Sequence, residues 1–200
     1  EVMTHAYFES GHSIKAMLRA LFLSDSFKSP SAWNARVKSP IELVVGTVRL
    51  AGGYDYPTSD VYSHIAASGY MGQDIYAPPS VEGWMGGADW ISTGSMVMRI
   101  NFAGEIVGNL ESKGVKEMVS TIRLAAGNFP TPDSLVNASL ASLGSLQVGD
   151  DTFNGLKDYV NNVIPSPSPN VKYEGTSNIP DEAIASLLQL IVATREYQFV

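Results

Sequence analysis

The chain has no cysteine and few charged residues. Without cysteine there is no disulfide, no thiol nucleophile, and no cysteine-bound zinc or iron–sulfur cluster. Charged residues make up 16% of the 200 residues, whereas about 25% is usual. Acidic residues outnumber basic ones by 20 to 13, and the net charge is −7. This acidity argues against a surface for nucleic acid or anionic membranes, because phosphate binding needs clustered cations.

Long apolar runs are missing as well. No window of about 18 consecutive apolar residues occurs, so no membrane-spanning helix is expected. No signal-peptide pattern opens the chain, which begins at Glu1 without an initiator methionine. We therefore expect a fragment or a processed product. Its length fits one domain over residues 1–200, burying about 70% of the surface of the unfolded chain.

Apolar residues at helical spacing predict the fold class. The pattern i, i+3, i+4, i+7 recurs along most of the chain, and strand signals are few. The sequence therefore predicts an all-α fold of about eight helices packed around one core. The expected helices cover residues 13–24, 39–52, 58–69, 90–108, 115–126, 131–143, 150–164 and 180–192.

The clearest helix start is the tetrapeptide Ser39-Pro40-Ile41-Glu42. The Ser39 hydroxyl can accept a hydrogen bond from the Glu42 amide, and the Glu42 side chain can reach back to the Ser39 amide. A second start is expected at Asp89, as the cap of the helix over 90–108. Ile91, Gly94, Ser95, Met98 and Phe102 would lie along one face of that helix.

Three segments interrupt the helical pattern. Residues 24–30 form a polar break. Residues 70–87 contain Pro78-Pro79 and four glycines, but they are too apolar for a linker. We expect an ordered loop there, and a loop of this length inside a domain usually carries a role. Residues 165–175 hold three prolines and few apolar groups, which predicts an exposed, mobile loop.

Motifs for catalysis, metals and phosphate are incomplete. The three histidines form no His-x-x-x-His pair, and Gly-x-Ser-x-Gly does not occur. The segment from Asp150 is similar to the opening of a calcium loop, but Asn161 stands where the bidentate glutamate belongs. The glycines of 83–87 lack the lysine and hydroxyl partners of a phosphate loop. We therefore predict no catalytic residue, metal ligand or cofactor.

An aromatic and amide cluster is the most informative region. Trp84 and Trp90 would supply contact area, while Gln73 and Asn101 would satisfy loop backbone groups or a ligand. Aromatic faces beside amides suit stacking on sugar rings or clamping a peptide. These four residues are our candidate binding site. The alternative is that both tryptophans only anchor the loop on the core.

Three stretches of the sequence resemble those of a known family and follow in the same order. They are MGQDIYAPPSVEGW from Met71 with RINFA from Arg99, KSPIELVVG from Lys38, and LQLIVATREYQ from Leu188. Together they resemble the signature of the bacterial domain-of-unknown-function family 1800. The resemblance implies a mainly helical fold and a place in the C-terminal portion of longer members. It also implies export in many members, hence a periplasmic or extracellular location, and an exported sulfatase-like protein encoded nearby as a candidate partner. It implies no established activity, cofactor or catalytic residue.

Three functional hypotheses follow. The first is a non-enzymatic binding or scaffold domain of an exported bacterial protein, with a glycan or peptide as ligand. The alternative is a hydrolase acting on an extracellular polymer through two of the carboxylates of Asp74, Glu82 and Asp89, which glycoside hydrolysis needs about 5–9.5 Å apart. The third is a structural half that completes its core with an N-terminal part. An exposed apolar patch on the early helices would favour this third hypothesis.

Overall fold

The computed structural model describes residues 1–52, 59–127, 130–163 and 179–200. This part of the chain holds ten α-helices and three 3-10 helices and contains no β-strand, which confirms the all-α prediction. The residues form two compact units, one of residues 1–36 with 199–200 and one of residues 37–198. The single domain over residues 1–200 stays a prediction. The loop expected over 165–175 lies outside the described residues.

The first unit contains α1 (Val2–Glu9), α2 (Ile14–Leu23), α3 (Asp25–Lys28) and the 3-10 helix η1 (Pro30–Ala32). Ser13, where the predicted helix begins, caps α2, with its hydroxyl accepting from the Ala16 amide at 3.3 Å. The polar break expected over residues 24–30 is wrong in part. The Ser24 hydroxyl accepts from the Phe27 amide at 3.2 Å, and this cap starts the short helix α3.

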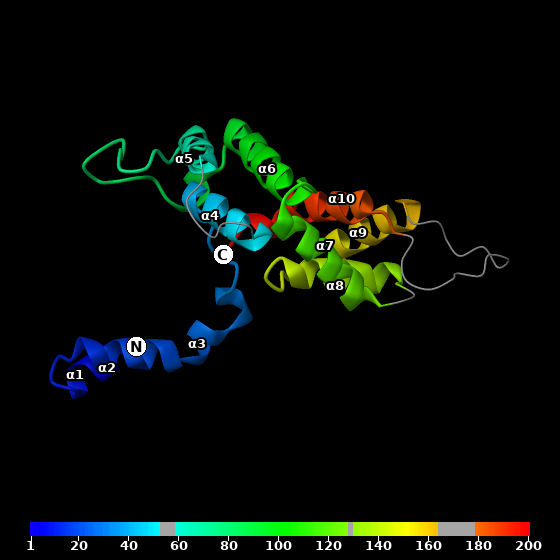
Figure 1. Cartoon of the computed structure of the whole chain (residues 1–200). Helices are drawn as coiled ribbons and strands as arrows, with labels where there is room; N and C mark the ends of the chain where they lie inside the picture. The colour runs from blue at the N-terminus through cyan, green and yellow to red at the C-terminus, as the bar shows by residue number, and fades with distance from the viewer. Residues whose placement is uncertain (53–58, 128–129, 164–178) are drawn as a thin grey trace. The chain divides into compact units, whose positions relative to one another are not determined.

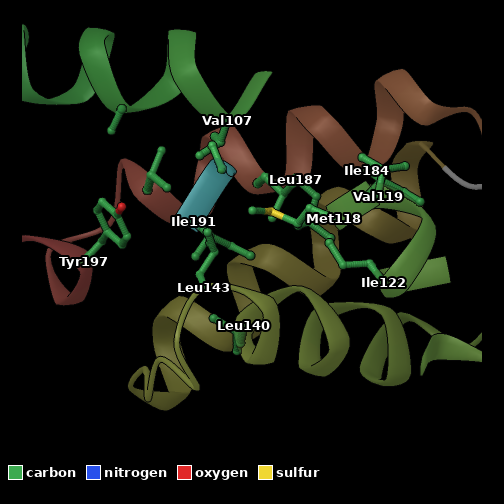
Figure 2. Packing of buried hydrophobic residues seen from close by; sticks show 14 of the residues in the cluster. Val107, Met118, Val119, Ile122, Leu140, Leu143, Ile184, Leu187, Ile191 and Tyr197 are labelled. Atoms are coloured by element: carbon green, nitrogen blue, oxygen red, sulfur yellow. The ribbon is translucent and has the colours of Figure 1, made fainter. Parts of the chain in front are cut away.

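The second unit is built around its last long helix (Figure 1). Its elements are α4 (Pro40–Ala51), α5 (Asp60–Tyr70), η2 (Gly87–Trp90), α6 (Thr93–Gly108), α7 (Lys113–Ala126), α8 (Pro132–Ser142), α9 (Asp150–Val163), α10 (Asp181–Val192) and η3 (Glu196–Gln198). Helix α10 contacts α6, α7, α8 and α9. Its apolar stripe lies at the centre of the core (Figure 2) because Ile184, Leu187, Leu188, Ile191 and Val192 are all fully buried.

Helix starts follow local side-chain chemistry. The capping box at Ser39 is present, with the Ser39 amide donating to the Glu42 carboxylate at 2.8 Å and the Glu42 amide donating to the Ser39 hydroxyl at 3.4 Å. Thr131 and Ser134 form the same reciprocal pair at the start of α8. Helix α4 ends at Gly52, whose φ of +66° is favourable only for glycine.

The start and the inward face of α6 differ from the prediction. Ser92, and not Asp89, caps this helix, since Ser92 and Ser95 exchange side-chain to backbone hydrogen bonds. Asp89 lies one turn earlier, exposed in η2. Met98 is 40% exposed, and the buried residues of α6 are Arg99, Ala103 and Val107. Phe102 of the predicted face is half-buried against the core. The fully buried side lies next to that face, because the buried Arg99 breaks the apolar pattern there.

One close approach between two helices shapes the second unit. Gly114, at the start of α7, packs against the end of α4 so tightly that an added Cβ would lie 2.0 Å from the Ala51 carbonyl oxygen and 2.8 Å from the Gly52 Cα. These neighbouring atoms belong to the backbone, so the contact has no flexible side chain that could give way. The glycine therefore sets the distance between the two helices.

Candidate functional site

The segment of residues 71–92, hereafter the 71–92 loop, is anchored at both ends. At its start Met71 is buried, and the Gln73 side-chain oxygen accepts a hydrogen bond from the Ile41 amide at 2.9 Å. At its end Trp90 is buried, and its carbonyl accepts from the Ser95 hydroxyl at 2.8 Å. Each anchor joins the loop to a helix, α4 at one end and α6 at the other, so the two ends of the loop are fixed.

Successive turns give the 71–92 loop its path between the anchors. The Ala77 amide donates to the Asp74 carbonyl at 3.2 Å, and the Gly83 amide donates to the Ser80 carbonyl at 3.1 Å. A third turn joins the Asp89 amide to the carbonyl of Gly86. In Figure 1 the loop, drawn in green between α5 and α6, runs out from these two helices. The expected loop is therefore a series of hydrogen-bonded turns.

The middle of the 71–92 loop presents large apolar and aromatic side chains to solvent. Tyr76 is 95% exposed and Trp84 is 37% exposed, and Val81 and Met85 are exposed as well. Tyr76 also has a φ of +64°, a left-handed conformation that is uncommon for bulky residues. Because Tyr76 is exposed, packing in the core does not account for its strained backbone conformation. Such strained positions cluster at functional sites.

The four candidate binding residues occupy three different environments. Gln73 bonds to the backbone of α4, so its amide satisfies a helix terminus. Trp90 is 5% exposed and belongs to the core, whereas Trp84 is partly open to solvent. Asn101 is exposed on α6, and its side chain bonds to none of the residues that the structure describes. Of the four candidate residues, only Trp84 offers an aromatic surface to a ligand, and the site of four residues stays a prediction.

The three carboxylates considered for hydrolysis, those of Asp74, Glu82 and Asp89, are all exposed along the same loop. The loop has no lysine, arginine or histidine, so its charge is −3. Within the described ranges no group of three or more histidine, aspartate or glutamate side chains could hold a metal ion.

A buried polar cluster lies at the start of α4, and the sequence did not predict it. Arg99, fully buried, donates to the Lys38 carbonyl at 2.8 Å and to the Gln198 side-chain oxygen at 3.5 Å. The Lys38 ammonium donates to the Tyr197 carbonyl at 2.7 Å and lies 4.2 Å from the centre of its ring. The Tyr197 hydroxyl bonds to the Thr47 hydroxyl at 2.8 Å. We call these five residues the Arg99 clamp.

The Arg99 clamp joins segments that are far apart in the sequence. Lys38, Arg99 and Gln198 each come from a different one of the three stretches that carry the family resemblance. Gln73, which bonds to the start of α4, comes from the same stretch as Arg99. Each of the three stretches contains polar residues among apolar ones, but nothing local shows which of these polar residues meet. Their meeting place requires the tertiary fold.

Lys38 predicts that stability rises with pH above neutrality. Burial lowers the pKa of Lys38 from its ordinary value of 10.5 to about 8, while Glu42 raises it and Arg99 lowers it further. Between these two values the unfolded chain binds a proton that the folded chain has released, so the free energy of unfolding rises with pH. Near pH 10 Tyr197 begins to oppose this gain, since burial raises its pKa more than the Thr47 hydrogen bond lowers it.

Urea unfolding at several values between pH 8 and 10 measures this effect. The urea midpoint of the wild type is expected to increase across this range. In Lys38→Met, which has no ammonium to titrate, the increase should disappear. A wild-type midpoint that falls, or an increase that persists in Lys38→Met, would contradict the assignment.

A second group of polar contacts lies at the start of α9. The Glu196 carboxylate accepts from the Gly149 amide at 3.1 Å and from the Thr152 hydroxyl at 2.9 Å. Burial raises the pKa of Glu196, but these hydrogen bonds and the nearby Arg195 lower it more, so the net pKa lies below its usual range. A hollow of about 590 Å³ lies beside it, lined in part by Asp150 and Asp151. The carboxylate lies at the amino-terminal end of α9, where the helix dipole favours a negative charge.

No helix in the described ranges combines the length and the apolarity needed to cross a membrane. A family model described as "Protein of unknown function (DUF1800)" matches residues 1–199. No curated protein and no solved structure matches the chain.

Proposed function

The chain belongs to the DUF1800 family, and because that family description assigns no activity, we propose from the structure that the chain is a binding domain that presents the 71–92 loop to a partner. The observation that carries the proposal is the contrast between the fixed ends of the loop and its exposed middle. Gln73 and Trp90 hold the ends, while Tyr76 and Trp84 lie in solvent between them. Binding residues commonly lie on loops that a rigid scaffold positions.

A fixed loop favours binding because little conformational entropy is lost when a partner docks. The turns at Asp74 and Ser80 already hold the backbone, so the ordering cost falls mainly on the exposed side chains. Aromatic residues have few rotatable bonds and large contact areas, and they dominate the energetics of interfaces. Exposed Tyr76 and Trp84 supply this kind of surface.

The charge of the 71–92 loop limits the classes of ligand that can bind it. With a charge of −3 and no cation, the loop repels anionic ligands. Aromatic rings beside carboxylates suit neutral sugars, through stacking, and basic peptides, through stacking and ion pairing. The glycan and peptide ligands expected from the sequence both fit this description. Export to the periplasm or the cell exterior and pairing with an exported sulfatase-like protein stay predictions from the family resemblance.

A glycan and peptide array tests this function. We expect the wild type to bind a subset of neutral glycans or basic peptides, and we expect Trp84→Ala and Tyr76→Gly each to weaken that binding by about tenfold or more, the loss typical of an interface hot spot. Tyr76→Gly is chosen because glycine adopts a φ of +64° at no cost, so the variant removes the ring and keeps the path of the loop.

Tyr62→Ala is the matched control, because Tyr62 is 79% exposed on α5, outside the loop. It should bind as the wild type does. The proposal is wrong if the wild type binds nothing on either array, or if both loop variants bind as well as the wild type. Thermal unfolding of each variant shows that a loss of binding is not a loss of fold.

A further inference from the structure

We propose that α2 docks an amphipathic helix of another protein whose apolar stripe is flanked by carboxylates. Helix α2 belongs to the first unit and the 71–92 loop to the second, and the proposal does not rest on the function proposed above.

Helix α2 is apolar around almost its whole circumference. Eight of the ten residues in IKAMLRALFL are apolar, and only Lys15 and Arg19 are charged. Helix α1 packs along α2, and the half-buried residues of α2 are Ala16, Met17, Ala20 and Leu21. None of the residues of α2 is fully buried. A helix that is apolar all round is normally enclosed by other elements, so one side of α2 lacks a partner within its own unit, residues 1–36 with 199–200.

The uncovered side of α2 has the shape of a helix-docking surface. Ile14, Leu18 and Phe22 are 62%, 40% and 52% exposed and follow one another at four-residue spacing. Such rows form the ridges that interlock with the side chains of a second helix. A hollow of about 570 Å³ lies along this side, lined by Lys15, Leu18, Arg19, Phe22 and Leu23. A ridge of large apolar residues beside a hollow can receive the apolar side chains of one partner helix.

The charges beside the ridge indicate the chemistry of that partner. Lys15 and Arg19 lie one turn apart, and neither forms an ion pair with any residue that the structure describes. No aspartate or glutamate occurs from Ser10 to Ser24. Two neighbouring cations next to an apolar stripe complement a helix that carries carboxylates at the edge of its own stripe.

Two other occupants fit these observations less well. An antiparallel second copy of α2 on the same face would bring the cations of both copies together, and like charges at an interface are unfavourable. A helix that lies in a membrane surface needs a strongly polar face opposite its apolar face. On α2 the opposite side consists of Ala16, Met17, Ala20 and Leu21.

The test uses two synthetic helical peptides of about 18 residues, or five helical turns. Both carry leucine at i, i+3, i+4 and i+7 spacing. One has glutamate at the edges of the leucine stripe, and its twin has lysine at the same positions. Fluorescence anisotropy of labelled peptides measures binding to the whole chain. We expect the glutamate peptide to bind at least about tenfold more tightly than the lysine peptide.

Two variants at exposed positions separate the apolar and charged contributions. Leu18→Asp should weaken binding of the glutamate peptide by about tenfold or more. The double variant K15E/R19E keeps the ridge and should reverse the preference, so that the lysine peptide binds more tightly. Reversal also shows that the variant retains a working docking surface.

Several results would overturn the proposal. The proposal is wrong if neither peptide binds, if both peptides bind equally well, or if Leu18→Asp leaves the affinity for the glutamate peptide unchanged. Self-association of the chain that Leu18→Asp abolishes in sedimentation equilibrium would assign the face to a second copy. Co-sedimentation with phosphatidylglycerol vesicles that the same variant abolishes would assign it to a membrane surface.

Discussion

Replacing Arg99 by alanine is expected to lower the free energy of unfolding by about 3–5 kcal/mol, the range for truncating a large buried side chain. The guanidinium fills a fully buried position and donates to the Lys38 carbonyl and the Gln198 side chain. The variant leaves a cavity and two acceptors without their donor, and each unsatisfied group costs about 1–3 kcal/mol. For a chain of this size the melting temperature should fall by about 6–20 °C.

Removing the charge offsets part of this loss of stability, because burying a charged guanidinium is itself unfavourable. Burial lowers the pKa of Arg99, and its Nε has no hydrogen-bond partner among the described residues. Arg99→Met separates the two contributions, since methionine fills most of the volume without the charge or the donors. We expect this variant to lose about 1–3 kcal/mol, less than the alanine variant. Denaturant unfolding measures the free energy of unfolding of both variants. If Arg99→Met is as stable as the wild type, the hydrogen bonds and charge of Arg99 contribute no net stability.

The second large effect is expected at the contact between α4 and α7. In Gly114→Ala the new methyl group would lie 2.0 Å from the Ala51 carbonyl oxygen and 2.7 Å from the carbonyl carbon of Gly52. Because both neighbours are backbone atoms, the two helices must separate, and overpacking of this kind costs about 1–3 kcal/mol or more. Alanine regains up to about 1 kcal/mol through its higher helix propensity. The clash is severe enough to dominate, so a net loss of about 2 kcal/mol is expected.

Gly155→Ala is the matched control for this prediction. Gly155 lies inside α9, and its added Cβ would have no neighbour within 4 Å. The same substitution should therefore raise the free energy of unfolding by up to about 1 kcal/mol. Chemical denaturation of both variants measures the two effects with opposite expected signs. A stabilised Gly114→Ala variant would show that α4 and α7 are further apart than the structure has them.

Helix starts could be predicted from the sequence where their chemistry is local. Ser39 and Glu42 contain both halves of a capping box within four residues, so the start of α4 needed no tertiary information. The start of α6 shows the limit of this reasoning. Asp89 and Ser92 are both acceptable caps, and the hydrogen bond from Ser95 to the buried Trp90 is a contact that only the folded loop supplies.

The candidate site was less predictable because burial decides the role of each residue. Trp84 and Trp90 are the same amino acid six positions apart, yet one is partly exposed and the other lies in the core. Arg99 is charged, and charged residues are almost never fully buried unless they are paired; its burial depends on acceptors from residues 38 and 198. Tyr76 carries no sequence signal for a positive φ, because that conformation follows from the turns around it.

The Arg99 clamp has a consequence for the order in which the chain folds. Its hydrogen bond from Lys38 to Tyr197 spans 159 positions, whereas the capping box that starts α4 spans only residues 39–42. Closing so long a loop carries a high entropic barrier and slows folding. During synthesis, therefore, Lys38 and Arg99 can enter the clamp only after Tyr197 and Gln198 have been made.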